Sequence, residues 1–174
     1  MWDSKLASDA IVFAEQKHDG QKMKYPENVS YSAHIFGVTM LAVKYASQMK
    51  NVNMDLLVCT AVLHDTLEDT SATFKEIEKV FGKQIAEGVL ALTKNEKLEK
   101  EKQMADCIER IKKQPKEVAI VKMADRMFNI RCRVPSWDNE KQEVYKAEAK
   151  FICESLGDAN PKMKKDFETL IENY

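Results

Sequence analysis

The sequence of 174 residues lacks the features that mark several protein classes. No apolar run reaches the ~18 uninterrupted residues of a membrane-spanning helix. The N-terminus has no apolar signal-peptide core, and no internal repeat or low-complexity segment is evident. Basic residues form no long run and the net charge is −1, which disfavours nucleic-acid binding. We therefore expect neither a membrane nor a nucleic acid among the partners of this protein.

Cysteine is scarce and widely spaced, and no two cysteines form a Cys-x-x-Cys pair. This spacing argues against a disulfide framework or a zinc knuckle and predicts reduced thiols in a cytoplasmic protein. The four cysteines are Cys59, Cys107, Cys132 and Cys153. The remaining composition, 44% apolar and 32% charged, is typical of a soluble globular protein, and the length fits one domain.

Alternating runs rich in Val, Ile and Thr are also missing, so no sheet is predicted. Helix start and stop signals recur instead; Thr73 and Glu76, for example, have the spacing of a capping box. The expected helices cover about 3–18, 33–51, 53–69, 73–81, 84–92, 115–130, 138–157 and the residues from 160 onward, with a solvated helix after the charged run 95–103. We predict a single all-α domain over residues 1–174.

The most informative segment is His64-Asp65-Thr66-Leu67-Glu68-Asp69, which follows an almost wholly apolar run. On a continuous helix, residues four apart share a face, so His64 is expected near Glu68 and Asp65 near Asp69. Acids at the end of a buried helix need partners, because an unpaired buried charge is costly. A divalent cation is the obvious partner.

Two further residues extend this cluster into a candidate metal site. His34 is one of only three histidines and lies near the start of an amphipathic helix, while Asp125 interrupts a second apolar helix. Two imidazoles and two carboxylates suit Mn²⁺, Fe²⁺, Co²⁺ or Zn²⁺. With open positions for water or substrate, such a site suits hydrolysis. Taken alone, a buried pair such as His64-Asp65 is more often a structural hydrogen bond than a metal site, and Asp125 beside Arg126 is more often part of an internal ion pair.

The order of these residues resembles that of the HD-domain metal-dependent phosphohydrolases. Two motifs resemble those of the RelA/SpoT-type alarmone hydrolase domain and its small stand-alone homologues. They are Leu63-His64-Asp65-Thr66-Leu67-Glu68-Asp69-Thr70 and Lys122-Met123-Ala124-Asp125-Arg126, the second followed by Asn129. The resemblance is strongest over residues 6–131, and the chain is too short to add the synthetase and regulatory domains of the long members. It implies an HD-type helical bundle, which the helices of 136–174 would complete.

The resemblance also implies an activity and a set of roles. The reaction would be Mn²⁺-dependent removal of pyrophosphate from the 3′ position of ppGpp, a small nucleotide. Glu68 and Asp69 would orient or deprotonate the attacking water. The implied metal ligands are His34, His64, Asp65 and Asp125. The implied substrate contacts are Lys24, Asn129 and Arg131. An oligomer is possible on this evidence but is not predicted.

One loop departs from the family pattern. The usual order is Gln-x-Arg-Lys, then Gly-x-Pro-Tyr and a short step to the first ligand histidine. Here Met23 replaces the arginine, the Pro-Tyr pair is missing, and the step to His34 is about two residues longer. An arginine could stack on a purine and pair with phosphate, whereas a methionine offers apolar contact only. Two alternatives follow: a phosphohydrolase acting on another nucleotide, and a non-enzymatic nucleotide-sensing domain.

Overall fold

The structure, a computed structural model, describes residues 2–132 and 134–174. It confirms the all-α prediction, since within these residues the only β-type pairing is an isolated bridge between Lys22 and Ser30. The helices are α1 (Ser4–Lys17), α2 (Ser32–Ala46), α3 (Met54–Leu63), α4 (Thr66–Asp69), α5 (Phe74–Phe81), α6 (Lys83–Leu92), α7 (Lys100–Ile111), α8 (Lys116–Arg131), α9 (Asn139–Leu156) and α10 (Pro161–Glu172), with the 3-10 turn η1 (Gly157–Ala159) between the last two.

Most helix starts lie where their capping residues predict them. The Asn53 side chain accepts a hydrogen bond from the backbone of α3, and Thr73 and Glu76 form the complete capping box at α5. The end of α2 is an exception, because the helix stops at Ala46 rather than near residue 51. There Ser47 and Gln48 turn their side chains back onto the carbonyl of Lys44 and so take up an acceptor of the last turn.

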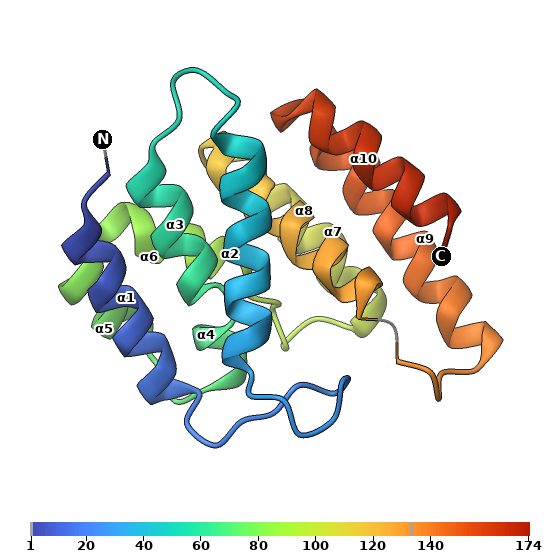
Figure 1. The fold of residues 1–174 in the computed structure, drawn as a ribbon, viewed down its shortest axis with the longest axis horizontal. Helices are drawn as coiled ribbons and strands as arrows, with labels where there is room; N and C mark the ends of the chain where they lie inside the picture. The colour runs from blue at the N-terminus through green and yellow to red at the C-terminus, as the bar shows by residue number, and fades with distance from the viewer. Residues whose placement is uncertain (1, 133) are drawn as a thin grey trace.

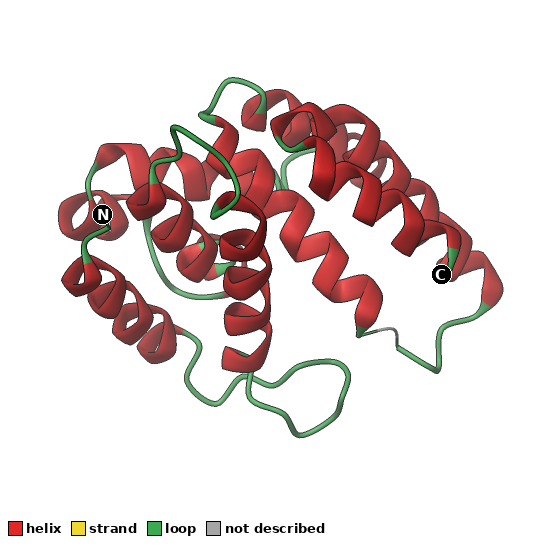
Figure 2. Cartoon of the chain, turned by 45° about the horizontal axis from the view of Figure 1, so that its top comes forward, coloured by secondary structure: helices red, strands yellow, loops and turns green. Residues whose placement is uncertain are grey.

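The core is built around α3, whose residues 56–63 are all buried. Helices α1 and α6 pack on one side of it, and α2 and α8 on the other (Figure 1). Helices α9 and α10 pack on α8 (Figure 2). Their buried apolar residues belong to the same core cluster as those of α2 and α8. Within the described residues, no helix combines the length and the apolar character needed to cross a membrane. This packing brings the first turn of α2, the end of α3 and the middle of α8 together.

The cysteines give a first testable prediction. Cys59, Cys107 and Cys153 are buried, and burial raises the pKa of Cys59 to about 12 and that of Cys153 to about 11. Only Cys132 is partly exposed. The thiolate is the reactive form and the reagent must reach it. At pH 8 we therefore expect one cysteine of the native protein to react quickly with a thiol reagent, and all four to react in the unfolded protein. The fast reaction should vanish in Cys132→Ser.

Candidate active site

Three of the predicted metal ligands, His34, Asp65 and Asp125, line a cavity of about 570 Å³, and the buried His64 lies directly behind them. Its walls come from the loop after α1, the start of α2, the acidic turn at α4, the segment after α6, helix α8 with the segment that follows it, and the middle of α9. Residues that line it include Met23, Lys24, Tyr31, His34, Asp65, Glu68, Asp69, Lys94, Lys122, Asp125, Arg126, Asn129, Trp137, Tyr145 and Glu148. Most of the residues singled out from the sequence therefore share one space.

Two imidazoles and two carboxylates converge at the base of this cavity. The Nε2 atoms of His34 and His64 lie 3.1 Å apart, and Asp65 Oδ2 lies 2.9 Å from His64 Nε2 and 3.3 Å from His34 Nε2. Asp125 Oδ1 lies 3.6 Å from His34 Nε2. Ligand atoms of His34, His64 and Asp125 all lie within 4.8 Å of one another. The structure thus brings together all four side chains expected as ligands.

The hydrogen bond of His64 Nδ1 determines which ring nitrogen of the neutral imidazole carries the proton. Nδ1 lies 2.7 Å from the carbonyl oxygen of Ala61, which can only accept a hydrogen bond. The proton of the neutral ring therefore sits on Nδ1, and the lone pair of Nε2 points toward Asp65. This arrangement is typical of histidines that bind metals.

Neighbouring side chains orient the carboxylates in the same way. The Tyr31 hydroxyl donates to Asp65 Oδ2 at 2.5 Å. Asn129 Nδ2 donates to Asp125 Oδ1 at 2.6 Å, and Lys122 Nζ donates to Asp125 Oδ2 at 3.2 Å. Each carboxylate therefore keeps one oxygen in the cluster while a neighbour fixes its rotation.

The electrostatics of the cluster favour charged groups despite burial. Burial alone would lower the pKa of His64, but the carboxylates of Asp65 and Asp125 outweigh it and raise that pKa to about 9. Burial opposes ionisation of Asp65 as well, yet the facing imidazoles hold its pKa well below the usual range. For Asp125, the ammonium of Lys122 is the main group that offsets burial and lowers the pKa.

This donor set fits a divalent cation. His34 and His64 each lie within 3.3 Å of Asp65, and ligand atoms of both imidazoles lie within 4.8 Å of Asp125; cation binding would replace the proton that raises the charge on His64. The cluster also opens onto the cavity, so coordination positions remain accessible to water or substrate.

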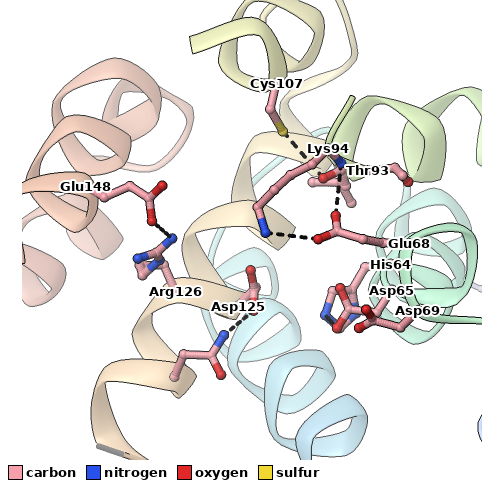
Figure 3. A network of polar contacts seen from close by, with 12 residues as sticks. His64, Asp65, Glu68, Asp69, Thr93, Lys94, Cys107, Asp125, Arg126 and Glu148 are labelled. Carbon is pink, nitrogen blue, oxygen red and sulfur yellow. Dashed lines mark hydrogen bonds and ion pairs between the residues drawn. The ribbon is translucent and has the colours of Figure 1, made fainter. Parts of the chain in front are cut away.

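The acidic cluster does not lie on one continuous helix, which corrects the expectation from the sequence. α3 ends at Leu63, and His64 and Asp65 form a turn before the short α4. The Thr66 hydroxyl donates a hydrogen bond to the Leu63 carbonyl at 2.7 Å, and His64 Nδ1 donates one to the Ala61 carbonyl. These side chains therefore occupy carbonyl acceptors that the backbone of a further helical turn would have used. The turn directs Asp65 and the two acids of α4 toward the cavity (Figure 3).

The acids of α4 differ in their surroundings. Glu68 is paired with Lys94, whose Nζ lies 2.9 Å from Oε1 and whose backbone nitrogen donates to Oε2 at 2.9 Å (Figure 3). The Asp69 residue is exposed overall, but partial desolvation of its carboxylate together with the charges of Asp65 and Glu68 raises its pKa. Glu68 is therefore a carboxylate held in one position by Lys94, whereas Asp69 keeps its proton to a higher pH than a free aspartate.

The three predicted substrate contacts have different positions. Lys24 and Asn129 line the cavity, but Arg131 is exposed and is not among the lining residues. Asn129 lies four residues after Asp125 and shares its helix face, whereas Arg131 lies six residues after it and is rotated by about 240° around the axis. The structure does not bring Arg131 to the site.

The loop before α2 contains one residue in the left-handed region. Asn28 has a φ of 64°, a conformation that favours glycine, and Tyr31 follows three residues later. The family's arginine position is occupied by Met23, which lines the cavity.

Sequence reasoning missed Tyr31. Its ring stacks on His18 at 4.9 Å between centroids and lies 5.1 Å from that of His34, and its hydroxyl bonds to Asp65. His18 is buried beside it and bonds to Gln21 rather than joining the ligand cluster. The signal was available, because a tyrosine three residues before a ligand histidine lies about one helical turn from it.

Removing the Tyr31 hydroxyl tests this role. We expect Tyr31→Phe to weaken Mn²⁺ binding by roughly 10- to 100-fold, because Asp65 loses the donor that orients it. Calorimetric titration of Mn²⁺ into the metal-free protein measures the change. Tyr45→Phe is the matched control, since the Tyr45 hydroxyl bonds to Asp166, outside the cavity. Equal Mn²⁺ affinities in the two variants would contradict the prediction.

The chain matches known proteins in sequence and in fold. The family model of the HD domain matches residues 10–161. The guanosine-3′,5′-bis(diphosphate) 3′-pyrophosphohydrolase MESH1 of Xenopus tropicalis is 30% identical over 162 residues, covering 91% of this chain and 88% of that protein. The MESH1 protein of Danio rerio is 28% identical over 166 residues, covering 93% and 90%.

A solved structure shows the same fold. It is described as a metazoan ortholog of SpoT that hydrolyses ppGpp and plays a role in starvation responses. It matches with a TM-score of 0.85 over 99% of this chain and 97% of its own, at 24% identity. The family match spans most of the chain and includes the converging histidines and aspartates. The protein is a member of the HD domain family.

Proposed function

We propose that the protein is a cytoplasmic, Mn²⁺-dependent guanosine-3′,5′-bis(diphosphate) 3′-pyrophosphohydrolase. The observation that carries the proposal is the cluster of His34, His64, Asp65 and Asp125 at the base of a cavity that also exposes the Glu68 carboxylate. The MESH1 relatives, which the chain matches over most of their length, are named for this reaction. The free cysteines fit a reducing compartment.

The proposed reaction is a hydrolysis at the 3′-linked phosphorus. When bound by His34, His64, Asp65 and Asp125, a divalent cation lowers the pKa of water and offsets phosphoryl charge. A water oxygen bonds to the phosphorus that is linked to the ribose 3′-oxygen, and the bond from that phosphorus to the 3′-oxygen breaks. The 3′-oxygen takes up a proton, so that the products are guanosine 5′-diphosphate and pyrophosphate.

The protein's own groups handle the proton and the position of the water. Glu68 accepts a proton from the water, because its carboxylate lines the cavity and is held by two hydrogen bonds from Lys94. Asp69 orients the water from the same turn. Lys24 and Asn129 contact the nucleotide at the mouth and along α8.

Turnover of purified protein tests the proposal. ppGpp is incubated with the protein and Mn²⁺, and products are separated by ion-exchange chromatography. Guanosine 5′-diphosphate and pyrophosphate in equal amounts, lost on chelation of the metal, are the expected result. An intact ppGpp pool beside an active MESH1 control would contradict the assignment.

A second candidate keeps the chemistry and changes the nucleotide. It is favoured by one observation: Met23, rather than an arginine, lines the cavity, and Tyr25 lies beside it. These side chains offer apolar and aromatic contact to a base but less charge to a phosphate. A panel of deoxynucleoside monophosphates and nicotinamide dinucleotide phosphates, assayed for phosphate against pyrophosphate release, separates the two candidates.

A further inference from the structure

Two buried cations lie one helical turn apart on α8 and line the cavity. Lys122 and Arg126, together called here the α8 cation pair, have side chains that are only 9% and 7% exposed. Residues at this spacing are neighbours on a helix surface, with about 5–6 Å between their Cβ atoms. Burying one cation is costly, and burying two like charges side by side is costlier, so the pair needs acceptors.

The protein supplies too few acceptors for these groups. Arg126 Nη2 bonds to Glu148 of α9 (Figure 3), and its guanidinium lies 4.1 Å from the centre of the Tyr145 ring. Its Nε and Nη1 atoms are buried and have no hydrogen-bond partner among the residues that the structure describes. The Lys122 ammonium has three donors, and Asp125 Oδ2 is its hydrogen-bond acceptor.

The acceptor of Lys122 is also a candidate metal ligand. Once Asp125 shares its charge with a divalent cation, it offsets less of the Lys122 charge, and the cation itself repels the ammonium. The α8 cation pair then faces the cavity with a further positive centre beside it. A group that carries several negative charges and many acceptor oxygens would satisfy all three.

We infer that the α8 cation pair is a binding site for a diphosphate group, which holds the 3′-linked diphosphate of the substrate and then the pyrophosphate product. The assignment rests on the proposed function for the identity of the substrate. The diphosphate fits because its charge is spread over two phosphoryl groups, matching two cations one turn apart. A purely structural role would join α8 to α9 through Glu148 but leaves Nε and Nη1 without a purpose.

Binding of inorganic pyrophosphate tests the site without turnover. Calorimetry of the metal-loaded protein uses the same free Mn²⁺ concentration in both solutions, and inorganic phosphate serves as a second, weakly chelating probe. Lys122→Met removes one charge from the pair. Arg126→Lys keeps the charge and a donor for Glu148 but removes the two unpartnered donors. Lys116→Met on the same helix, outside the cavity, is the control.

We expect each variant of the pair to bind pyrophosphate roughly tenfold or more weakly, as for the loss of charged hydrogen bonds, and Lys116→Met to bind it like the parent. Bound Mn²⁺ should stay at the parent level in Arg126→Lys. In Lys122→Met it is measured separately and the two proteins are compared at equal Mn²⁺ occupancy, because Lys122 also orients Asp125. Unchanged pyrophosphate affinity in Arg126→Lys, or a loss in Lys122→Met explained wholly by lost Mn²⁺, would overturn the inference. If ppGpp is not hydrolysed at all, the pyrophosphate affinities still test whether the α8 cation pair binds a diphosphate group, because the binding measurement requires no turnover.

Discussion

Glu68→Gln is expected to lower kcat for ppGpp hydrolysis by about 10²- to 10⁴-fold, the usual contribution of a general base. The glutamine keeps the size of the side chain and an oxygen for one of the two Lys94 bonds, but it cannot accept a proton from water. Because Glu68 is not in the ligand cluster, bound Mn²⁺ should be unchanged. Single-turnover kinetics with metal analysis of the same sample measures both quantities.

Glu87→Gln is a matched control, since Glu87 is a carboxylate on α6 that pairs with Lys83 and lies outside the cavity. It should leave kcat and bound Mn²⁺ as in the parent. Turnover by Glu68→Gln at the parent rate would remove Glu68 from the chemistry. It would also revive the alternative of a nucleotide-sensing domain, in which a carboxylate at this position has no chemical role.

The parts of the fold that depend on local chemistry were predictable from the sequence. The starts of α3 and α5 follow from Asn53 and from the Thr73–Glu76 capping box, because a cap acts within its own turn. The break at His64 was not predictable from periodicity. It depends on where the Thr66 hydroxyl and the His64 ring find carbonyl acceptors, which an apolar pattern does not reveal.

The candidate site shows the same division. The resemblance to HD-domain enzymes supplied the four predicted ligands, and the fold places their side chains close to one another. Arg131 could have been set aside from the sequence, because six residues after Asp125 places it on another face of α8. The burial of the α8 cation pair could not have been predicted from the sequence, because the motif Ala124-Asp125-Arg126 does not indicate whether the arginine is exposed to solvent or covered by α9.

His64→Ala is expected to abolish both turnover and metal-dependent stabilisation. Mn²⁺ at 100 times its dissociation constant stabilises a folded protein by about 2.7 kcal/mol. For a chain of this size that corresponds to a rise in Tm of roughly 5–10 °C. The variant lacks the Nε2 atom that lies beside Asp65 and His34 and would bind the cation, so its Tm should rise little or not at all when Mn²⁺ is added. Thermal unfolding followed by circular dichroism, with and without Mn²⁺, measures the difference.

The same variant should change how the stability of the metal-free protein depends on pH. Burial disfavours charge on His64, but Asp65 and Asp125 raise its pKa from 6.5 to about 9. The stabilisation by the imidazolium, about 3 kcal/mol, is therefore complete below pH 6.5 and is lost as the pH rises through 9. We expect the free energy of unfolding of the metal-free parent to fall across this window, and that of His64→Ala to fall much less.

Bound Mn²⁺ should reverse this trend, because the cation binds the neutral ring and competes with the proton. The metal-loaded parent should gain stability relative to the metal-free protein as the pH rises from 6.5 toward 9. Urea unfolding at several pH values, with Mn²⁺ or with chelator, gives both slopes. Parallel slopes for the parent and His64→Ala would mean that the charge on this imidazole does not hold the two carboxylates together.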